Sequence, residues 1–324
     1  MAKGFIFLLT ISNKMHTIKH THPILLLGGH MSTSGGFANA ISRGESIGCT
    51  AIQIFVKSNR QWYAKPITDQ EATAFKDAWQ QSQIKNVIAH AAYLINIGSP
   101  NKDAHAKSLE ALSVELDRCE QLGIPSLVLH PGSRLDTAPE QCYKTIAQGL
   151  DEVISNYAGK TQILLENMAG QGSNVGNSFE ALAEIYHHVH HKRRVGFCLD
   201  TCHAFVAGYD LSSAEGYTKT WNEFDAILGI ENLKAIHIND SKKGLGSKAD
   251  RHEHIGHGKI GSLGFKLLFN DPRFFDIPKV LETPKEGDGL KEDAQNMQTI
   301  VGLLDAPNKK LVQGTPLERY IELP

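Results

Sequence analysis

Metal-binding types of side chain recur at the ends of successive β-rich segments of this chain. Six consecutive segments end in histidine, aspartate or glutamate, and neighbouring members of the series lie 34 to 45 residues apart. The six are His90, His130, Glu166, Asp200, His237 and Glu282. A single polar residue after a strand is often only a turn residue or a helix cap. Six in consecutive units are hard to explain in that way, and they constrain the fold strongly.

Eight β-rich segments alternate with stretches that carry apolar residues at helical spacing. The segments are Ile24–Gly28, Ala51–Val56, Asn86–His90, Ser126–His130, Gln162–Glu166, Val195–Asp200, Leu233–Ile238 and Lys279–Glu282. Their number and rhythm predict a single (β/α)8 TIM barrel, an α/β fold. A doubly wound open sheet is the alternative, but Gly28-Gly29-His30 lacks the glycine-rich fingerprint usual in that fold.

In such a barrel, all strands end on one face, so the six polar residues are expected to converge there. Because side chains alternate along a strand, the residues two positions earlier should also point inward. These residues are Ile88, Val128, Leu164, Cys198, Ala235 and Val280. The sequence therefore predicts a metal cluster at the C-terminal face of the strands, above a compact apolar layer.

Three further residues extend the ring. His203 lies three positions after Asp200, and Asp250 and His252 follow the seventh β-rich segment within a polar loop. Together they give five histidines and four carboxylates as candidate ligands. A catalytic zinc uses about three protein ligands, so nine ligands indicate about three metals. Glu166, near the middle of the ring, is the candidate to bridge two of them.

The net charge of −2 gives no overall basic footprint for nucleic acid. Four ionised ligands and three divalent cations would nevertheless leave the site at about +2. Basic residues also follow two of the strands and are expected to contact phosphates along a duplex. They are Lys57, Arg60 and Lys65 after the second segment and Lys242, Lys243, Lys248 and Arg251 after the seventh.

The ends of the chain differ from its centre. We expect a disordered N-terminal extension at 1–22, a barrel domain at 23–306 and a C-terminal tail at 307–324. The apolar run Gly4–Ile11 is too short to span a bilayer, so no membrane partner is expected. Five cysteines, an odd number without a CxxC pair, indicate free thiols in a reducing compartment, and we expect a cytoplasmic monomer.

Several stretches closely resemble signatures of the endonuclease IV family, the apurinic/apyrimidinic endonucleases of base-excision repair. They are Leu199-Asp-Thr-Cys-His-Ala-Phe-Val-Ala-Gly-Tyr-Asp210, Glu166-Asn-Met-Ala-Gly-Gln-Gly172, His237-Ile-Asn-Asp240 and His130-Pro-Gly-Ser133. The resemblance runs from about Leu26 to about Leu304, and the motifs occur in family order at family-like spacing. The extension and the tail have no recognised counterpart in compact members.

The resemblance implies three zinc ions, with manganese or iron able to take one or more of the places. His90 and His130 would hold the first ion, and Glu166 would bridge it to the second. Asp200, His237 and Glu282 would complete the second site, and His203, Asp250 and His252 would hold the third. All nine positions match the family pattern.

The resemblance also implies the reaction. Arg60, Tyr93 and Leu94 match residues that enter the minor groove and hold open the space left by the flipped-out abasic nucleotide. A metal-bridging hydroxide would attack the phosphorus 5′ to the abasic site, leaving a 3′-hydroxyl and a 5′-deoxyribose phosphate. Removal of 3′-phosphates or other 3′-blocking groups would be a related activity.

Two other classes of protein remain as alternatives. A metal-dependent sugar isomerase or epimerase on the same scaffold would hold one or two metals with mainly carboxylate ligands, and would not need the Asp250-Arg-His252 or Arg60-Gln-Trp62 segments. A protein that binds abasic DNA without cutting it would have little reason to keep nine ligands. Metal stoichiometry tests the first alternative, and binding without cleavage would favour the second.

Overall fold

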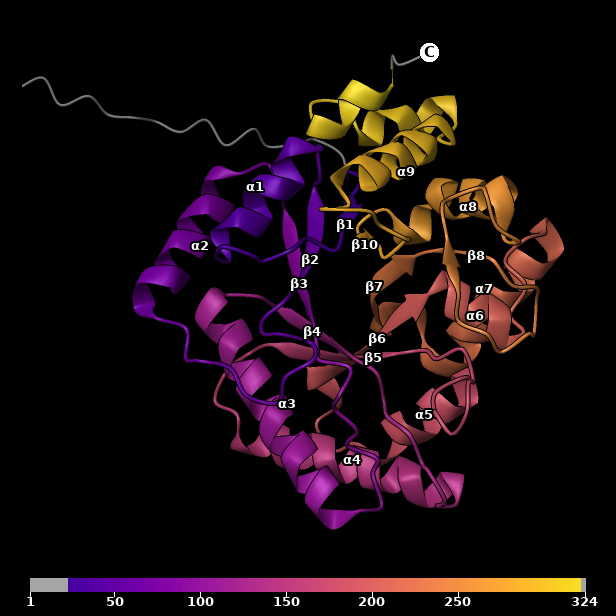
Figure 1. The fold of residues 1–324 in the computed structure, drawn as a ribbon. Coiled ribbons are helices and arrows are strands. Elements are labelled where there is room, and N and C mark those ends of the chain that lie inside the picture. Colours follow the sequence, from indigo (N-terminus) through magenta and orange to yellow (C-terminus); the bar gives the residue numbers. More distant parts are fainter. Residues whose placement is uncertain (1–22, 322–324) are drawn as a thin grey trace, which may run out of the picture.

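Eight parallel strands form a barrel with helices around its outside in the computed structural model, which describes residues 23–321 (Figure 1). The strands are β1 Leu27–Gly29, β2 Ala51–Phe55, β3 Asn86–His90, β4 Ser126–Leu129, β5 Gln162–Glu166, β6 Val195–Asp200, β7 Leu233–Ile238 and β10 Lys279–Leu281. Their hydrogen-bonded order is β1-β10-β7-β6-β5-β4-β3-β2. The predicted N-terminal extension lies outside the described residues.

The barrel closes between β1 and β2. The Thr50 amide donates to the Leu27 carbonyl at 2.9 Å, and the Met31 amide donates to the Gln53 carbonyl at 2.8 Å. Gly28 permits this close approach, because a Cβ atom there would lie 1.9 Å from the Ala51 carbonyl oxygen. The predicted TIM barrel is confirmed.

Nine α-helices follow or flank the strands within residues 23–321. They are α1 Ala38–Ser46, α2 Asp69–Gln81, α3 Lys102–Leu122, α4 Pro139–Asn156, α5 Phe179–His188, α6 Thr201–Ala207, α7 Ala214–Leu228, α8 Gly261–Asn270 and α9 Leu290–Gly302. A short antiparallel ribbon, β8 Asp240–Ser241 and β9 His252–Glu253, follows β7. None of these helices has both the length and the apolar character needed to cross a membrane.

Helix starts follow local sequence signals. Thr68 and Glu71 form a reciprocal capping box at the start of α2. Asn101 caps α3 by accepting a hydrogen bond from the Ala104 amide at 2.9 Å. Asp200 caps α6 in the same way, through the His203 amide at 2.8 Å. A strand-end carboxylate thus also starts the short helix that carries His203.

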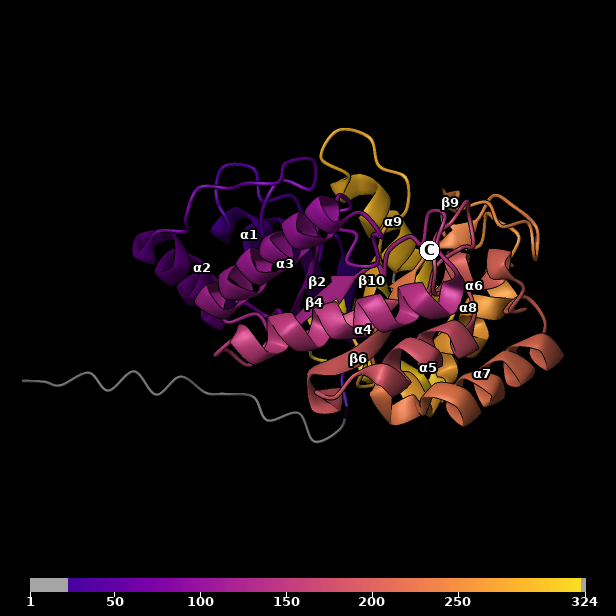
Figure 2. The ribbon, with the colours of Figure 1, turned by 90° about the horizontal axis from the view of Figure 1, so that it is seen from below.

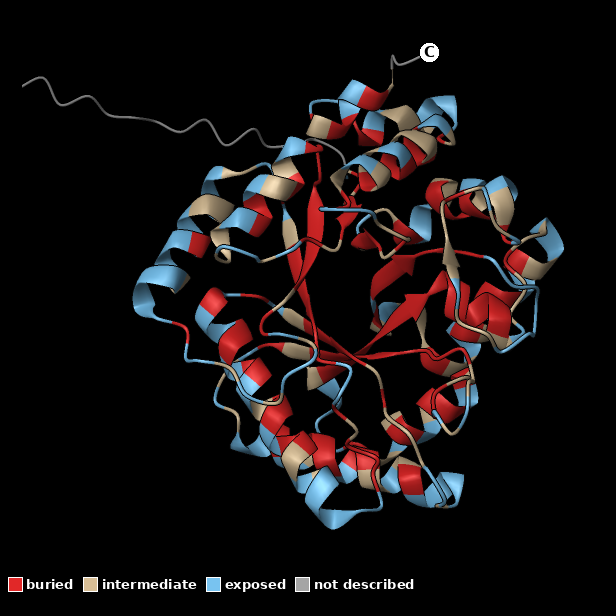
Figure 3. Ribbon diagram, in the orientation of Figure 1, coloured by how far each residue is buried: buried red, intermediate tan, exposed pale blue. Residues whose placement is uncertain are grey.

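The buried apolar residues form two separate clusters. The large one lies between the strands and the surrounding helices, and Figure 3 shows buried residues on the strands and on the helix faces turned toward them. The small one lies inside the barrel and consists of Ile88, Val128, Leu164, Cys198, Ala235 and Val280. These six are the residues predicted to form the apolar layer, and all are at most 1% exposed.

Strand positions agree closely with the sequence prediction except at the first strand. The segment Ile24–Gly28 was expected, whereas β1 spans Leu27–Gly29. The reason is a competing partner, because the Leu25 amide donates to the Leu311 carbonyl at 2.8 Å. The Leu25 amide is thus paired with the C-terminal segment, whereas the Leu26 carbonyl still accepts from the Lys279 amide of β10 at 2.9 Å.

The C-terminal segment packs on the barrel, although it was expected to be a tail. It forms two 3-10 helices, η4 Ala306–Leu311 and η5 Pro316–Tyr320. Leu317 is fully buried, and the Tyr320 hydroxyl donates to the Ile47 carbonyl at 2.6 Å. In Figure 1 the segment lies beside α9 and next to α1. Its contacts to Leu25 and Ile47 place it at the outside of the barrel near the starts of β1 and β2, away from the strand-end ring.

Candidate metal centre

The six strand-end residues meet at one rim of the barrel. His90, Glu166, Asp200 and His237 lie within the last residues of β3, β5, β6 and β7, and His130 and Glu282 directly follow β4 and β10. Because the strands are parallel, their C-terminal ends share one face of the barrel, which Figure 2 shows from the side. Three of the six, Glu166, Asp200 and His237, have no exposed surface, whereas His130 and Glu282 are partly exposed.

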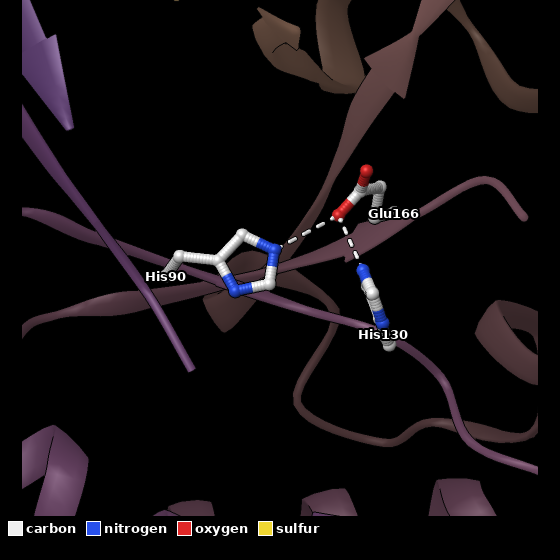
Figure 4. Close-up of side chains that lie close together, drawn as sticks. All are labelled: His90, His130 and Glu166. Carbon is white, nitrogen blue, oxygen red and sulfur yellow. Dashed lines mark hydrogen bonds and ion pairs between the residues drawn. The ribbon is translucent and has the colours of Figure 1, made fainter. Parts of the chain in front are cut away.

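The first group joins His90, His130 and Glu166. The Nε2 atoms of the two histidines lie 3.1 and 3.2 Å from the same Glu166 oxygen, Oε2 (Figure 4). His90 donates its other ring N–H, at Nδ1, to the Ala91 carbonyl at 2.7 Å. That bond orients the ring so that Nε2 faces the group, as is usual for a metal-bound histidine.

The second group uses the other Glu166 oxygen. His237 Nδ1 lies 3.1 Å from Glu166 Oε1 and 3.4 Å from Glu282 Oε2. Asp200 belongs to the same group, since one ligand atom from each of these four residues lies within 4.8 Å of the others. Glu166 therefore contributes to both groups, which is the geometry required of a bridging carboxylate.

The third group surrounds Asp250. Its two oxygens lie 3.1 Å from His203 Nε2 and 3.1 Å from His252 Nε2. His252 donates from Nδ1 to the Glu282 carbonyl at 2.9 Å. Among the described residues, the buried atoms His252 Nε2 and Asp250 Oδ1 have no hydrogen-bond partner. A buried imidazole nitrogen and a buried carboxylate oxygen that face one another at this distance are a donor set that suits a divalent cation.

The electrostatics of the ring also favour cations. Burial lowers the pKa of His203, but Asp200, Asp250 and Glu166 outweigh burial and raise this pKa well above its ordinary value. Burial raises the pKa of Glu166, yet the surrounding histidines hold it well below its ordinary value. Such shifts mean that the carboxylates stay ionised and attract positive charge.

Three buried amides support the ring and were not identified from the sequence. Gln53 donates to Glu282 at 2.6 Å, and its carbonyl oxygen lies 2.8 Å from His237 Nε2. Asn239 donates to the Asp200 carboxylate at 2.6 Å, and the Asn167 side chain accepts from the Asp200 amide at 2.6 Å and donates to the Asp200 carbonyl at 3.2 Å. The available signal for Gln53 was its position as the one polar residue within the strand Ala51–Phe55.

The predicted DNA-contacting residues lie at the mouth of the ring. Tyr93 is 54% exposed and Leu94 is 38% exposed, so two adjacent large side chains present apolar surface to solvent. The Tyr93 ring stacks on His130, with 5.4 Å between ring centroids. Arg60 is exposed on the neighbouring loop after β2. The structure thus brings exposed aromatic, aliphatic and cationic groups to the edge of the candidate metal centre.

Lys57 departs from the prediction that it contacts phosphates. Its ammonium group pairs with the Glu115 carboxylate at 3.1 Å, and both side chains are only 1% exposed. It is therefore not available to a ligand at the surface. By contrast, the other predicted cations are exposed: Lys65, Lys242, Lys243, Lys248 and Arg251.

Comparison with known proteins agrees with this geometry. A family model described as a xylose isomerase-like TIM barrel matches residues 41–300. Probable endonuclease 4 of Chloroflexus aurantiacus is 45% identical over 278 residues, which cover 86% of this chain and 97% of that protein. Probable endonuclease 4 of Geotalea daltonii is 46% identical over 85% of this chain and 96% of its own length. The chain belongs to the endonuclease IV family.

Solved structures place this endonuclease IV family member among related barrels. The crystal structure of endonuclease IV from Thermus thermophilus superposes with a TM-score of 0.76 at 35% identity, covering 86% of this chain and 98% of that chain. A D-tagatose 3-epimerase-like protein superposes with a TM-score of 0.65 at 16% identity, covering 86% of this chain and 98% of that chain. The second likeness shows only a shared fold.

Proposed function

We propose that this chain is an apurinic/apyrimidinic endonuclease that hydrolyses the phosphodiester 5′ to an abasic site in duplex DNA. The observation that carries the proposal is a set of nine metal-type side chains in overlapping groups that share Glu166, Asp200 and His252, in a member of the endonuclease IV family. The products would be a 3′-hydroxyl and a 5′-deoxyribose phosphate. The same site would remove 3′-phosphates and related 3′-blocking groups.

The ring would hold three divalent cations. The ligands would be His90, His130, Glu166, Asp200, His203, His237, Asp250, His252 and Glu282. When bound, the cations would supply a nucleophile from water at neutral pH and offset negative charge at the phosphate. Zinc suits this mixture of nitrogen and oxygen ligands, and manganese or iron could fill one or more sites.

The side chains have distinct tasks around such cations. Glu166 fixes the spacing between two sites, because each of its oxygens faces a different group. Gln53 and Asn239 hold Glu282 and Asp200 in place through short hydrogen bonds. This buried support would keep the ligand positions fixed while the substrate enters, which favours preorganised catalysis.

Residues at the edge of the ligand ring would recognise the DNA. Tyr93 and Leu94 present exposed apolar surface beside His130, and Arg60 adds a cation. We propose that these three enter the space left by a flipped-out abasic nucleotide, where no base competes for stacking. The enzyme would act as a monomer in the cytoplasm, where its five free, buried cysteines would remain reduced.

A labelled duplex with one tetrahydrofuran abasic analogue tests the proposal. This analogue cannot undergo β-elimination, so a cut that leaves a 3′-hydroxyl must be hydrolytic. We expect chelator-sensitive cleavage of this duplex and none of an undamaged duplex, with metal content measured on the same preparation.

An intact duplex in the presence of fully metallated protein would contradict the proposal. Binding of the abasic duplex without cleavage would then favour a damage-binding protein. Absence of both would direct attention to metal-dependent sugar isomerisation or epimerisation, since an epimerase-like protein shares the fold of this chain.

A further inference from the structure

A buried ion pair lies outside the ring, beneath the loops that form its mouth. Lys57 stands in the loop between β2 and α2, residues 56–68, which we call the β2 loop. Glu115 stands on α3, on the helix face turned toward the barrel. Their charged atoms are 3.1 Å apart, and both side chains are only 1% exposed. No step proposed above uses this pair.

Each partner also binds backbone of a different mouth loop. The Lys57 ammonium donates to the Gln61 carbonyl at 2.8 Å, next to Arg60 in the β2 loop. Both Glu115 oxygens accept from the Ala92 amide, at 3.2 Å each. Ala92 precedes Tyr93 in the loop between β3 and α3, residues 91–101, which we call the β3 loop. The pair therefore ties together the two loops that carry Arg60, Tyr93 and Leu94.

Helix α3 fixes the β2 loop at further points. Arg118, one turn after Glu115, donates to the Val56 carbonyl at 2.6 Å and to the Lys65 carbonyl at 2.7 Å. Lys107, nearer the start of the helix, lies over the Trp62 ring at 4.5 Å from its centroid. The ends of the loop and its middle thus rest on side chains of one helix.

We infer that Glu115 is a positioning residue for abasic-site recognition, acting through its buried pair with Lys57 to hold the β2 and β3 loops in mutual register. This inference rests on the proposed function. The single carboxylate is the link between the loops, since it contacts Lys57 in one and Ala92 in the other.

The physical argument is one of preorganisation. A buried ion pair gains little net stability over an apolar pair of similar size, so stability alone does not account for it. Its strict distance and direction requirements do, however, fix the relative position of the two chain segments. Loops already held in their binding arrangement lose less conformational freedom when their side chains enter the DNA.

Steady-state cleavage of the tetrahydrofuran duplex tests the inference with Glu115→Gln. The amide can still accept from Ala92, but it leaves Lys57 without a counter-ion. We expect KM for the duplex to rise about tenfold or more, with kcat changed less than about threefold and metal content unchanged. A merely structural defect would lower the active fraction, and so the apparent kcat, and would leave KM unaltered.

Two further variants sharpen the test. Glu110→Gln removes a carboxylate from the exposed face of the same helix and should leave KM at the wild-type value. The double variant Lys57→Met/Glu115→Met replaces the ion pair with apolar side chains of similar length. We expect it to recover the thermal stability lost in Glu115→Gln while KM stays raised, because methionine can make neither the Lys57 contact to Gln61 nor the Glu115 contact to Ala92.

The inference is overturned if Glu115→Gln keeps KM within about twofold of wild type, or if the double variant restores KM along with stability. Failure of the proposed function has a different signature, since wild-type protein itself would then leave the tetrahydrofuran duplex intact. The wild-type arm therefore separates the two.

Discussion

Glu166 is the residue on which the candidate metal centre converges. Nitrogen atoms of four histidines lie 3.1 to 3.3 Å from its two oxygens: His90, His130, His203 and His237. No part of its side chain is exposed to solvent. A carboxylate in this setting stays ionised and can draw cations to both of its oxygens.

Replacing Glu166 with glutamine tests this role directly. Glutamine keeps the shape but loses the charge and one acceptor oxygen, so it cannot bridge two cations. We expect cleavage of the tetrahydrofuran duplex to fall by a factor on the order of 1,000 or more, with near-wild-type circular dichroism and reduced metal content. Turnover close to that of wild type would rule out the bridging role.

Residues of the site differ in how well their roles could be predicted from the sequence. Strand-end ligands such as His90 recur with the period of the β/α unit, and this repetition made them visible. Gln53 does not belong to this repeating series. Its role depends on contacts to Glu282 and His237, which come close to β2 only when the barrel closes. Lys57 was misassigned because its partner, Glu115, lies far along the chain on a helix face.

The segment after α9 is a structural element whose packing could not be predicted from the sequence. Its three prolines and mixed charge favoured a tail, whereas Leu311 and Leu317 are fully buried. Each 3-10 helix is too short to show a clear apolar period. Tertiary hydrogen bonds hold the segment in place: the Leu311 carbonyl accepts from the Leu25 amide, and the Tyr320 hydroxyl donates to the Ile47 carbonyl.

The substitution Leu317→Ala measures how much this packing contributes. Removal of a fully buried leucine side chain leaves a cavity, and we expect the free energy of unfolding to fall by about 2–5 kcal/mol in urea denaturation. Cleavage per folded molecule should not change, because the segment lies away from the ring. Leu263→Ala, at a side chain 51% exposed, serves as the control and should change stability by about 0.5 kcal/mol or less. An equally small effect of Leu317→Ala would contradict the packing role.

A second contact between elements should respond to pH. Asp271, after α8, accepts from the Tyr217 hydroxyl on α7 at 3.0 Å and pairs with Arg273 at 2.6 Å. Burial raises the pKa of Asp271, but hydrogen bonds from Arg273 and Tyr217 outweigh it and hold this pKa below its ordinary value. Since the folded pKa is depressed, the stabilisation is present above the unfolded pKa of about 3.9 and is lost as pH falls through the folded value.

We therefore expect Asp271→Asn to reduce the free energy of unfolding by about 1 kcal/mol at pH 7. The difference between wild type and variant should shrink as the pH falls below about 4, because the carboxyl then binds a proton in the unfolded chain, and it should vanish below the folded pKa. Urea denaturation at several pH values checks this. A gap that stays constant down to acid pH would show that the carboxylate charge is not the cause.

At the scale of the whole molecule, the core and the candidate metal centre are separate. The large apolar cluster surrounds the barrel, whereas the ligands sit at its rim. Removal of metal by chelation should therefore leave the fold intact but lower its stability, because cations that bind only the folded state stabilise it by mass action. We expect the melting temperature to drop by roughly 10 °C and to recover on addition of zinc, while far-ultraviolet circular dichroism at about 25 °C is unchanged. An unshifted melting temperature would contradict metal binding at the ring.

The overall architecture was predictable because it repeats. Eight alternating units and six strand-end ligands reinforce one another, so small errors in strand ends, such as the shift at Leu27, do not alter the conclusion. Features that occur only once could not be predicted in this way, because they depend on tertiary contacts. The α3 contacts and the packed C-terminal segment are examples.

Because of the apolar layer inside the barrel, the candidate metal centre is open to solvent only at the C-terminal face of the strands. Beneath the ligands, six buried side chains pack together and close the interior of the barrel: Ile88, Val128, Leu164, Cys198, Ala235 and Val280. Ions and DNA must then share the same entrance. A duplex seated over it would trap the ions beneath, and replacement of a lost ion would have to wait until the product departs.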